Sequence, residues 1–166
     1  MLKDLGLCLV TGATGFVGQV LVAELLAHDC QVRVFSRSEN TVSAACEQVT
    51  GDWVADPEDY KKALQDVETV FHLAGIAHAK AHADDYENSS TVTLALARQA
   101  AAAGVKRLIY VSSTKAMSEP STEIMYEDSG TWPNEPYGYW KRITEQRLLN
   151  EINIEHIAVL RPCLIY

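Results

Sequence analysis

The chain alternates short apolar runs with longer segments in which apolar residues recur at helical spacing. Residues 7–10 form the first run, and an uninterrupted apolar run of this length is typical of a buried strand. Residues 15–27 follow as a predicted helix. Its apolar side chains are expected on one face, which consists of Val17, Val20, Leu21 and Leu25. The pattern therefore predicts a strand that leads through a short loop into a helix.

Five further strands and three further helices complete the predicted order. The strands are expected at residues 32–35, 48–50, 70–73, 107–111 and 157–160. The helices are expected at residues 57–64, 85–103 and 136–150. Residues 118–135 are polar, contain Pro120 and Pro133, and are expected to form a loop of the kind that often carries function.

This alternation predicts an α/β fold in which a doubly wound parallel sheet is covered by helices on both faces, the Rossmann fold. The expected strand order is 3-2-1-4-5-6, with a ligand at the carboxyl ends of the strands near the switch point. Hydrophobic residues make up 48% of the 166 residues, which suits a full core. Residues 1–166 are therefore expected to form one domain.

Charge and cysteine content limit the classes of partner and the cellular compartment that we expect for this chain. The formal net charge is -8, so the surface should repel nucleic acid and anionic membranes, and neither is an expected partner. No apolar run is long enough to span a bilayer, and the N-terminus lacks the features of a signal peptide.

The four cysteines form no CxxC pair, which predicts reduced thiols in a cytoplasmic protein. His78 and His82 are four residues apart, but zinc usually needs further ligands, so no metal is expected.

A glycine-rich loop, residues 12–18, joins the first predicted strand to the first predicted helix. A plain glycine turn is the alternative interpretation, but a strand before the loop and a helix after it favour a dinucleotide site. The helix N-terminus offers unpaired N–H groups and a partial positive charge to a pyrophosphate. The residues expected to contact the cofactor here are Gly12, Thr14, Gly15, Phe16, Val17 and Gly18.

The end of the second predicted strand bears on the choice of cofactor. NAD-specific sites place an acidic residue there to bind the ribose 2′-hydroxyl. Here Ser36 stands in that position and Arg37 follows it. A guanidinium can bind a 2′-phosphate, which a carboxylate would repel. We therefore predict a preference for NADP, with NAD as the alternative; a solvated Arg37 without a role in binding is the other interpretation.

Several further motifs follow the GxxGxxG loop in a regular order. They are Gly51-Asp52, His72-Leu73-Ala74-Gly75, Val111-Ser112-Ser113, Tyr137-Gly138-Tyr139-Trp140-Lys141 and Leu160-Arg161-Pro162. In this order and spacing the chain resembles the extended short-chain dehydrogenase/reductases, the group of sugar-nucleotide epimerases and dehydratases. The resemblance covers essentially the whole chain, and six motifs in register are far more specific than any one of them.

The resemblance implies contacts for the rest of the cofactor. Asp52 would hydrogen-bond the adenine, with Trp53 beside it. The segment after the fourth strand would line the cofactor through Leu73, Ala74 and Gly75. Pro162 and Cys163 would lie near the nicotinamide, and Tyr137 and Lys141 would reach the nicotinamide ribose.

Tyr137 and Lys141 are candidate catalytic residues. They are four residues apart on a predicted helix, so their side chains share one face. A tyrosine with an ordinary pKa of about 10 is a poor base, but a nearby ammonium and an oxidised nicotinamide favour its phenolate. Tyr137 could then take a proton from a substrate hydroxyl during hydride transfer. Ser113 is expected to bind the same substrate oxygen and to stabilise its charge.

Other positions depart from the family's pattern. The family's helical asparagine falls on Ser89, with Asn88 one residue early, and Thr93 matches its threonine. The family's substrate domain is built mainly from chain beyond the sixth strand, so we expect that domain to be lacking here. Two functions remain open: the cofactor domain of a nucleotide-sugar epimerase, dehydratase or reductase, or a dinucleotide-binding module without turnover. A homodimer through the helix after the fourth strand and the YxxxK helix is also expected from the resemblance.

Overall fold

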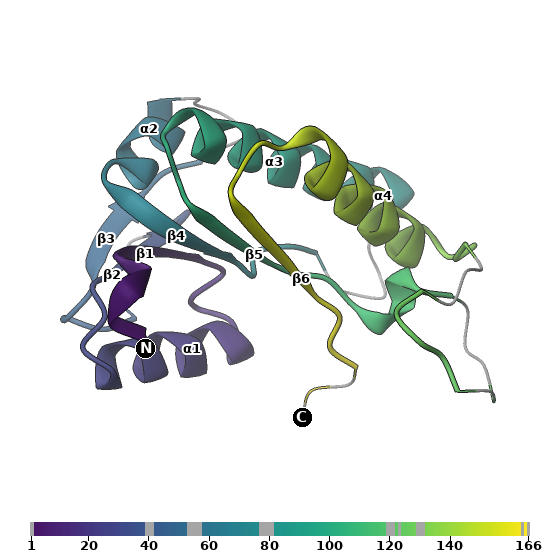
Figure 1. The fold of residues 1–166 in the computed structure, drawn as a ribbon, viewed down its shortest axis with the longest axis horizontal. Helices are drawn as coiled ribbons and strands as arrows, with labels where there is room; N and C mark the ends of the chain where they lie inside the picture. The colour runs from purple at the N-terminus through teal and green to yellow at the C-terminus, as the bar shows by residue number, and fades with distance from the viewer. Residues whose placement is uncertain are drawn as a thin grey trace.

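The computed structural model describes residues 2–38, 42–52, 58–76, 82–118, 122, 124–128, 132–163 and 165. These residues contain one six-stranded, all-parallel sheet with the order β3-β2-β1-β4-β5-β6 (Figure 1). The strands are β1 (Leu7–Thr11), β2 (Val32–Ser36), β3 (Glu47–Thr50), β4 (Val67–His72), β5 (Arg107–Val111) and β6 (His156–Leu160). The predicted fold class and strand order are confirmed.

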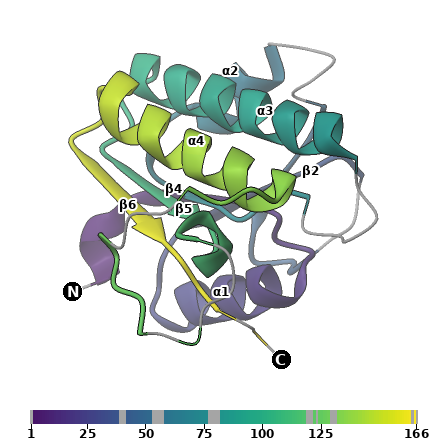
Figure 2. The same cartoon turned by 90° about the vertical axis from the view of Figure 1, so that its right-hand side faces the viewer.

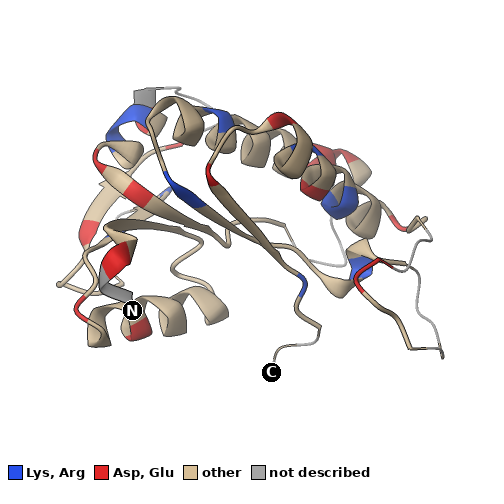
Figure 3. Ribbon diagram, in the orientation of Figure 1, with Lys and Arg blue, Asp and Glu red and all other residues tan. Residues whose placement is uncertain are grey.

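Helices cover both faces of the sheet, as Figures 1 and 2 show. One face carries α1 (Phe16–Ala27), and the other carries α2 (Glu58–Leu64), α3 (Ala83–Ala102) and α4 (Pro136–Glu151). Two short 3-10 helices, η1 (Leu2–Leu5) and η2 (Thr114–Ala116), were not expected from the sequence. Acidic and basic residues are interspersed over these elements (Figure 3).

The apolar face of α1 differs from the predicted one. Val17 and Val20 are 38% and 58% exposed, whereas Gly18, Val22 and Leu25 are buried. A Cβ atom on Gly18 would overlap the carbonyl oxygen of Gly12, so the helix approaches the loop most closely at this glycine. The close approach at Gly18 therefore sets the rotation of α1 about its axis. Apolar periodicity alone did not identify the side of the helix that is buried.

The fourth strand also begins earlier than predicted, at Val67 instead of residue 70. Polar residues interrupt its apolar pattern, yet Thr69 is fully buried and its hydroxyl donates a hydrogen bond to the carbonyl of Leu5 at 2.6 Å. A buried hydroxyl with a partner costs far less than one without. The strand therefore includes a buried polar residue, which an apolar run does not predict.

The hydrophobic core consists of two layers, one on each side of the sheet. Alternate side chains of a strand point to opposite faces. Leu9 of β1 accordingly packs under α2, α3 and α4, together with residues such as Leu94 and Leu148. Cys8 and Val10 pack on the other side against Val22 of α1 and its neighbours.

Arg33 of β2 is a buried cation that ties the sheet to the end of α2. Its guanidinium donates hydrogen bonds to the carbonyls of Ala63 at 2.9 Å and Gln65 at 2.6 Å. It also forms an ion pair with Glu47 of β3 at 2.9 Å. The last carbonyls of a helix have no partner within the helix, so this side chain caps α2 from the neighbouring sheet.

We expect Arg33→Met to lower the free energy of unfolding by about 2–4 kcal/mol, because it leaves buried carbonyls without a donor. Urea denaturation followed by circular dichroism measures this change. Lys106→Met is the matched control, since Lys106 forms an exposed ion pair with Glu68 at 2.7 Å and should hardly change the midpoint. Equal destabilisation of the two variants would contradict the capping role of Arg33.

Candidate cofactor and active site

The loop between β1 and α1 passes very close to the segment that follows β4. Gly12 has a φ of 71°, in the left-handed region that favours glycine. A Cβ atom on Gly12 would lie 2.7 Å from the backbone nitrogen of Ala74. The loop therefore requires glycine at this position both for its backbone conformation and for space.

The start of α1 leaves backbone groups available to a ligand. Gly15 is the N-cap residue, and its N–H donates to the carbonyl of Gly12 at 3.0 Å. Phe16, Val17 and Gly18 form the first turn, whose N–H groups have no carbonyl partner within a helix. Together with the positive end of the helix dipole, this bare backbone fits the pyrophosphate of a dinucleotide.

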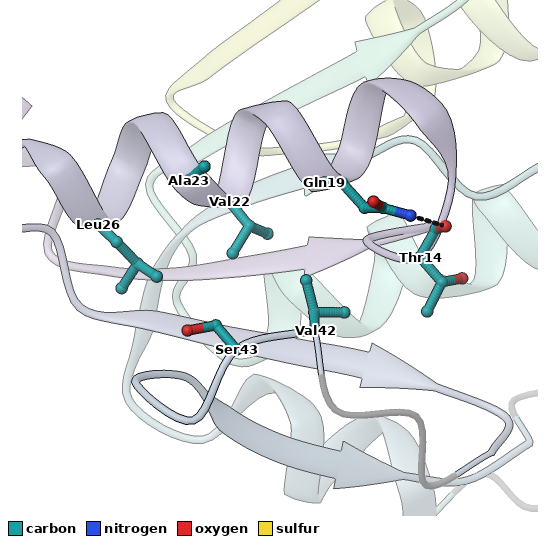
Figure 4. Close-up of a pocket in the computed structure, with 7 residues that line it drawn as sticks. All are labelled: Thr14, Gln19, Val22, Ala23, Leu26, Val42 and Ser43. Carbon is teal, nitrogen blue, oxygen red and sulfur yellow. Dashed lines mark hydrogen bonds between the residues drawn. The ribbon is translucent and has the colours of Figure 1, made fainter.

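A groove of about 610 Å³ extends from this loop along α1 (Figure 4). At its loop end the Gln19 side-chain amide donates a hydrogen bond to the carbonyl of Thr14 at 2.8 Å. Of the described residues that were predicted to bind the cofactor, only Thr14 lines this groove. The remaining lining residues are Gln19, Val22, Ala23, Leu26, Val42 and Ser43. The groove therefore lies beside the predicted cofactor surface and shares only its edge.

The carboxyl ends of β2 and β3 lie side by side, as the predicted adenosine site requires. The Ser36 hydroxyl donates to the carbonyl of Ser38 and accepts a hydrogen bond from the Gln48 amide at 2.8 Å. Arg37 is exposed. The Asp52 N–H donates to the Asp59 carboxylate at 2.8 Å. Trp53, also predicted to bind the cofactor, lies outside the described residues.

The segment after β4 links the glycine loop to the candidate catalytic lysine. The Leu73 N–H donates to the carbonyl of Thr11 at 3.2 Å, which holds this segment beside β1. A Cβ atom on Gly75 would lie 3.8 Å from the Lys141 amine. Leu73, Ala74 and Gly75 therefore run from the predicted pyrophosphate position towards Lys141.

The three candidate catalytic side chains come together at the carboxyl edge of the sheet. Ser113 follows β5, and its hydroxyl lies close enough to the phenol of Tyr137, in the first turn of α4, to favour the phenolate. Lys141, one turn later, donates to the carbonyl of Val111 at 3.0 Å. The Lys141 nitrogen lies 6.0 Å from the centre of the Tyr137 ring. Tyr86 of α3 packs its edge against that ring, with 5.5 Å between centroids.

The pKa shifts of this site differ from the expected pattern. Burial raises the pKa of Tyr137 above its usual value; the Ser113 hydrogen bond opposes this, and the Tyr86 phenol adds to it. Burial lowers the pKa of Lys141 to about 8, against the opposing effect of the Glu145 carboxylate. Tyr137 is therefore a neutral phenol near pH 7, and Lys141 can lose its proton close to neutrality.

A small cleft of about 10 Å³ adjoins Tyr137 and Lys141. It is lined from four segments by Ile76, Tyr86, Ser89, Ser90, Tyr110, Tyr137, Trp140, Lys141 and Thr144. Ser89, where the family has asparagine, thus faces the site, whereas Asn88 is exposed. The described residues leave room for about one water molecule here.

An ion pair that sequence reasoning missed connects α4 to the end of β6. The Arg161 guanidinium donates two side-by-side hydrogen bonds to the Glu145 carboxylate, at 3.0 and 2.7 Å, and Glu145 is only 2% exposed. The Thr114 N–H donates to the carbonyl of Pro162 at 3.1 Å. These contacts place Pro162 next to the Ser113 segment, while Cys163 beyond it is exposed. Glu145 lies one turn beyond Lys141 on the same helix face, which was the available signal.

Comparison with known proteins agrees with this geometry. Residues 8–166 match the model of the NAD dependent epimerase/dehydratase family. A 2-alkyl-3-oxoalkanoate reductase of Stenotrophomonas maltophilia is 33% identical over 95% of this chain and 50% of its own. A UDP-glucose 4-epimerase of Vibrio cholerae is 32% identical over 95% of this chain and 51% of its own. Among solved structures, MoeE5 in complex with UDP-glucose and NAD has a TM-score of 0.80 at 27% identity, over 93% of this chain and 53% of its own.

The chain spans about half the length of the curated relatives it matches. In the part of the chain that the structure describes, no helix is long and apolar enough to cross a membrane. The family match covers nearly every residue, and the sheet order and the glycine loop agree with it. The chain therefore belongs to the NAD-dependent epimerase/dehydratase family.

Proposed function

We propose that this domain binds a nicotinamide dinucleotide and serves hydride transfer to or from a secondary alcohol carbon of a nucleotide sugar. The observation that carries the proposal is the proximity of the Ser113 and Tyr137 side chains at the sheet edge where Lys141 also lies. The glycine loop and residues Leu73–Gly75 run towards the same place. A hydride acceptor held there would lie beside the candidate acid or base.

Each of the three side chains has a separate task in this proposal. A bound nicotinamide would supply or accept the hydride, and in its oxidised form it would add a positive charge to the site. Tyr137, kept protonated by burial, donates its proton to a substrate carbonyl. In the reverse direction it takes the proton of the substrate hydroxyl, and a charged Lys141 favours its phenolate. Ser113 hydrogen-bonds the same substrate oxygen and stabilises its developing charge.

The substrate class rests on the relatives. The Vibrio cholerae relative is a UDP-glucose 4-epimerase, and the MoeE5 structure is a complex with UDP-glucose and NAD, which together support a nucleotide sugar as the substrate.

A dinucleotide-binding module without turnover is the second candidate function. The cleft of about 10 Å³ at Tyr137 and Lys141 favours it, because the described residues alone leave no room for a sugar ring.

We expect Tyr137→Phe to reduce turnover of UDP-sugars at least about a hundredfold, because it removes the proton that is transferred. Cofactor affinity should stay within about twofold, since the ring remains. Absorbance of the reduced nicotinamide reports turnover, and calorimetry reports cofactor binding. Tyr126→Phe is the matched control, because Tyr126 is 63% exposed in a loop. Turnover that survives in Tyr137→Phe would identify another group as the acid or base.

For the cofactor, we propose a preference for NADP over NAD. Ser36 offers no carboxylate at the end of β2, and the exposed Arg37 can bind a 2′-phosphate there. We expect Arg37→Ala to weaken NADPH binding about tenfold and to leave NADH binding unchanged. Fluorescence titration of both cofactors measures this difference. NADH binding as tight as NADPH binding in the wild type would overturn the preference.

We also propose a cytoplasmic homodimer formed through α3 and α4. None of the four cysteines forms a disulfide in the described residues, which suits a reducing compartment. Leu149 and Tyr139 of α4 are 58% and 40% exposed, and apolar side chains on a helix surface favour association.

In analytical ultracentrifugation the wild type should sediment as a dimer. Leu149→Glu should shift it towards monomer, because the interface would then bury an unpaired charge. Ile124→Glu is the control, since Ile124 is 81% exposed and lies in a loop that belongs to neither helix. A wild type that sediments only as monomer would exclude this interface.

A further inference from the structure

A buried histidine stands at the last position of β4, directly before the segment that lines the predicted cofactor site. His72 is 2% exposed. Its Nδ1 lies 2.7 Å from the Thr11 hydroxyl of β1, and its Nε2 lies 2.9 Å from the Thr93 hydroxyl of α3. Its ring stacks on that of Tyr110 with 6.0 Å between centroids. Both ring nitrogens therefore have fixed partners on two different elements.

One direction satisfies all the hydrogen bonds around His72. The Thr93 hydroxyl donates its proton to the carbonyl of Ser89 at 2.9 Å, because a carbonyl can only accept. Thr93 must then accept from His72, which places the imidazole proton on Nε2. Nδ1 of the neutral ring is consequently an acceptor, so the Thr11 hydroxyl donates to it.

The same chain of hydrogen bonds extends to the cofactor segment. The Thr11 oxygen accepts the backbone N–H of Ala74 at 3.2 Å. Ala74 is the residue against which Gly12 packs, with no space for a Cβ atom. At the other end, Ser89 also lies near Gly75. Four hydrogen bonds thus run in a single direction from Ala74 through His72 to Ser89.

We propose that His72, held as its Nε2–H tautomer, is a positioning residue that fixes the backbone of Leu73–Gly75 for dinucleotide binding. Loss of this tautomer would turn Nδ1 into a donor and remove the acceptor that orients the Thr11 hydroxyl, whose oxygen holds the Ala74 N–H. The inference rests on the proposed cofactor binding, and it adds the residue that orders the Leu73–Gly75 segment.

The charge state of His72 supports this role. Burial, with a smaller contribution from the Lys141 charge, lowers the pKa of His72 to about 3. Protonation would place a second N–H opposite the Thr11 hydroxyl and leave the chain without a consistent direction. Tyr110 stacks on the ring, and the Thr11 and Thr93 hydroxyls lie at its two nitrogens. The ring is therefore neutral throughout the physiological range.

The tautomer can be measured directly by nitrogen-15 NMR of the histidine side chains in the full chain. We expect an unprotonated Nδ1 and a protonated Nε2, unchanged between pH 5.5 and pH 8. The His72 signals are assigned by their disappearance in His72→Asn. A protonated Nδ1, or titration within this pH range, would overturn the proposal.

The effect on binding is tested with Thr93→Val, which removes the acceptor of the His72 proton and nearly preserves side-chain volume. Thr69→Val is the matched control: Thr69 is buried on the same strand as His72, and its hydroxyl donates to Leu5 outside this chain of hydrogen bonds. We expect Thr93→Val to raise the Kd for NADH and NADPH about tenfold, and Thr69→Val to leave it unchanged. Thr93→Ser should restore the wild-type affinity.

Thermal unfolding of the same variants separates positioning from stability, because each valine variant loses hydrogen bonds of a buried threonine: those to His72 and Ser89 in Thr93→Val, and that to Leu5 in Thr69→Val. An unchanged Kd in Thr93→Val, or an equal change in Thr69→Val, would overturn the inference and leave the proposed function intact. A wild type that binds neither cofactor would overturn the proposed function and the inference together.

Discussion

The close passage of two backbones at Gly12 is the constraint on which the rest of the site depends. A side chain there would collide with Ala74, and a Cβ atom on Gly18 would collide with the Gly12 carbonyl. The first collision would separate β1 from the segment after β4, and the second would move α1 off the sheet. With both glycines, the positive end of α1 and the Leu73–Gly75 segment lie at the same edge of the sheet.

Parallel strand pairing brings the remaining chemistry to this edge. In the β1–β4 pair Thr11 lies opposite His72, and in the β5–β6 pair Val111 lies opposite Leu160. Residues that follow these strands therefore emerge side by side, although they are far apart in the chain. The start of α4 packs on the segment after β5, where a Cβ atom on Gly138 would overlap the Lys115 carbonyl, and this contact brings Tyr137 to Ser113.

Burial then decides how these groups behave. The same desolvation that raises the pKa of Tyr137 lowers that of Lys141, so Lys141 loses its proton well before Tyr137 does, whereas in water the two groups have similar pKa values. Glu145 opposes the shift of Lys141 and is itself held by Arg161 from the end of β6. The electrostatics of the site thus depend on contacts between α4 and β6 as well as on its central residues.

Much of this arrangement follows from local patterns in the sequence. Apolar runs and turn residues located all six strands, and the GxxGxxG loop predicted the sharp connection at Gly12, because these features depend on neighbours along the chain. Only the tertiary structure decided four features: the buried side of α1, the inclusion of Thr69 in β4, the Glu145–Arg161 pair and the hydrogen-bond partners of His72. Each depends on which atoms from distant segments come into contact, and hydrophobic periodicity carries no information about those contacts.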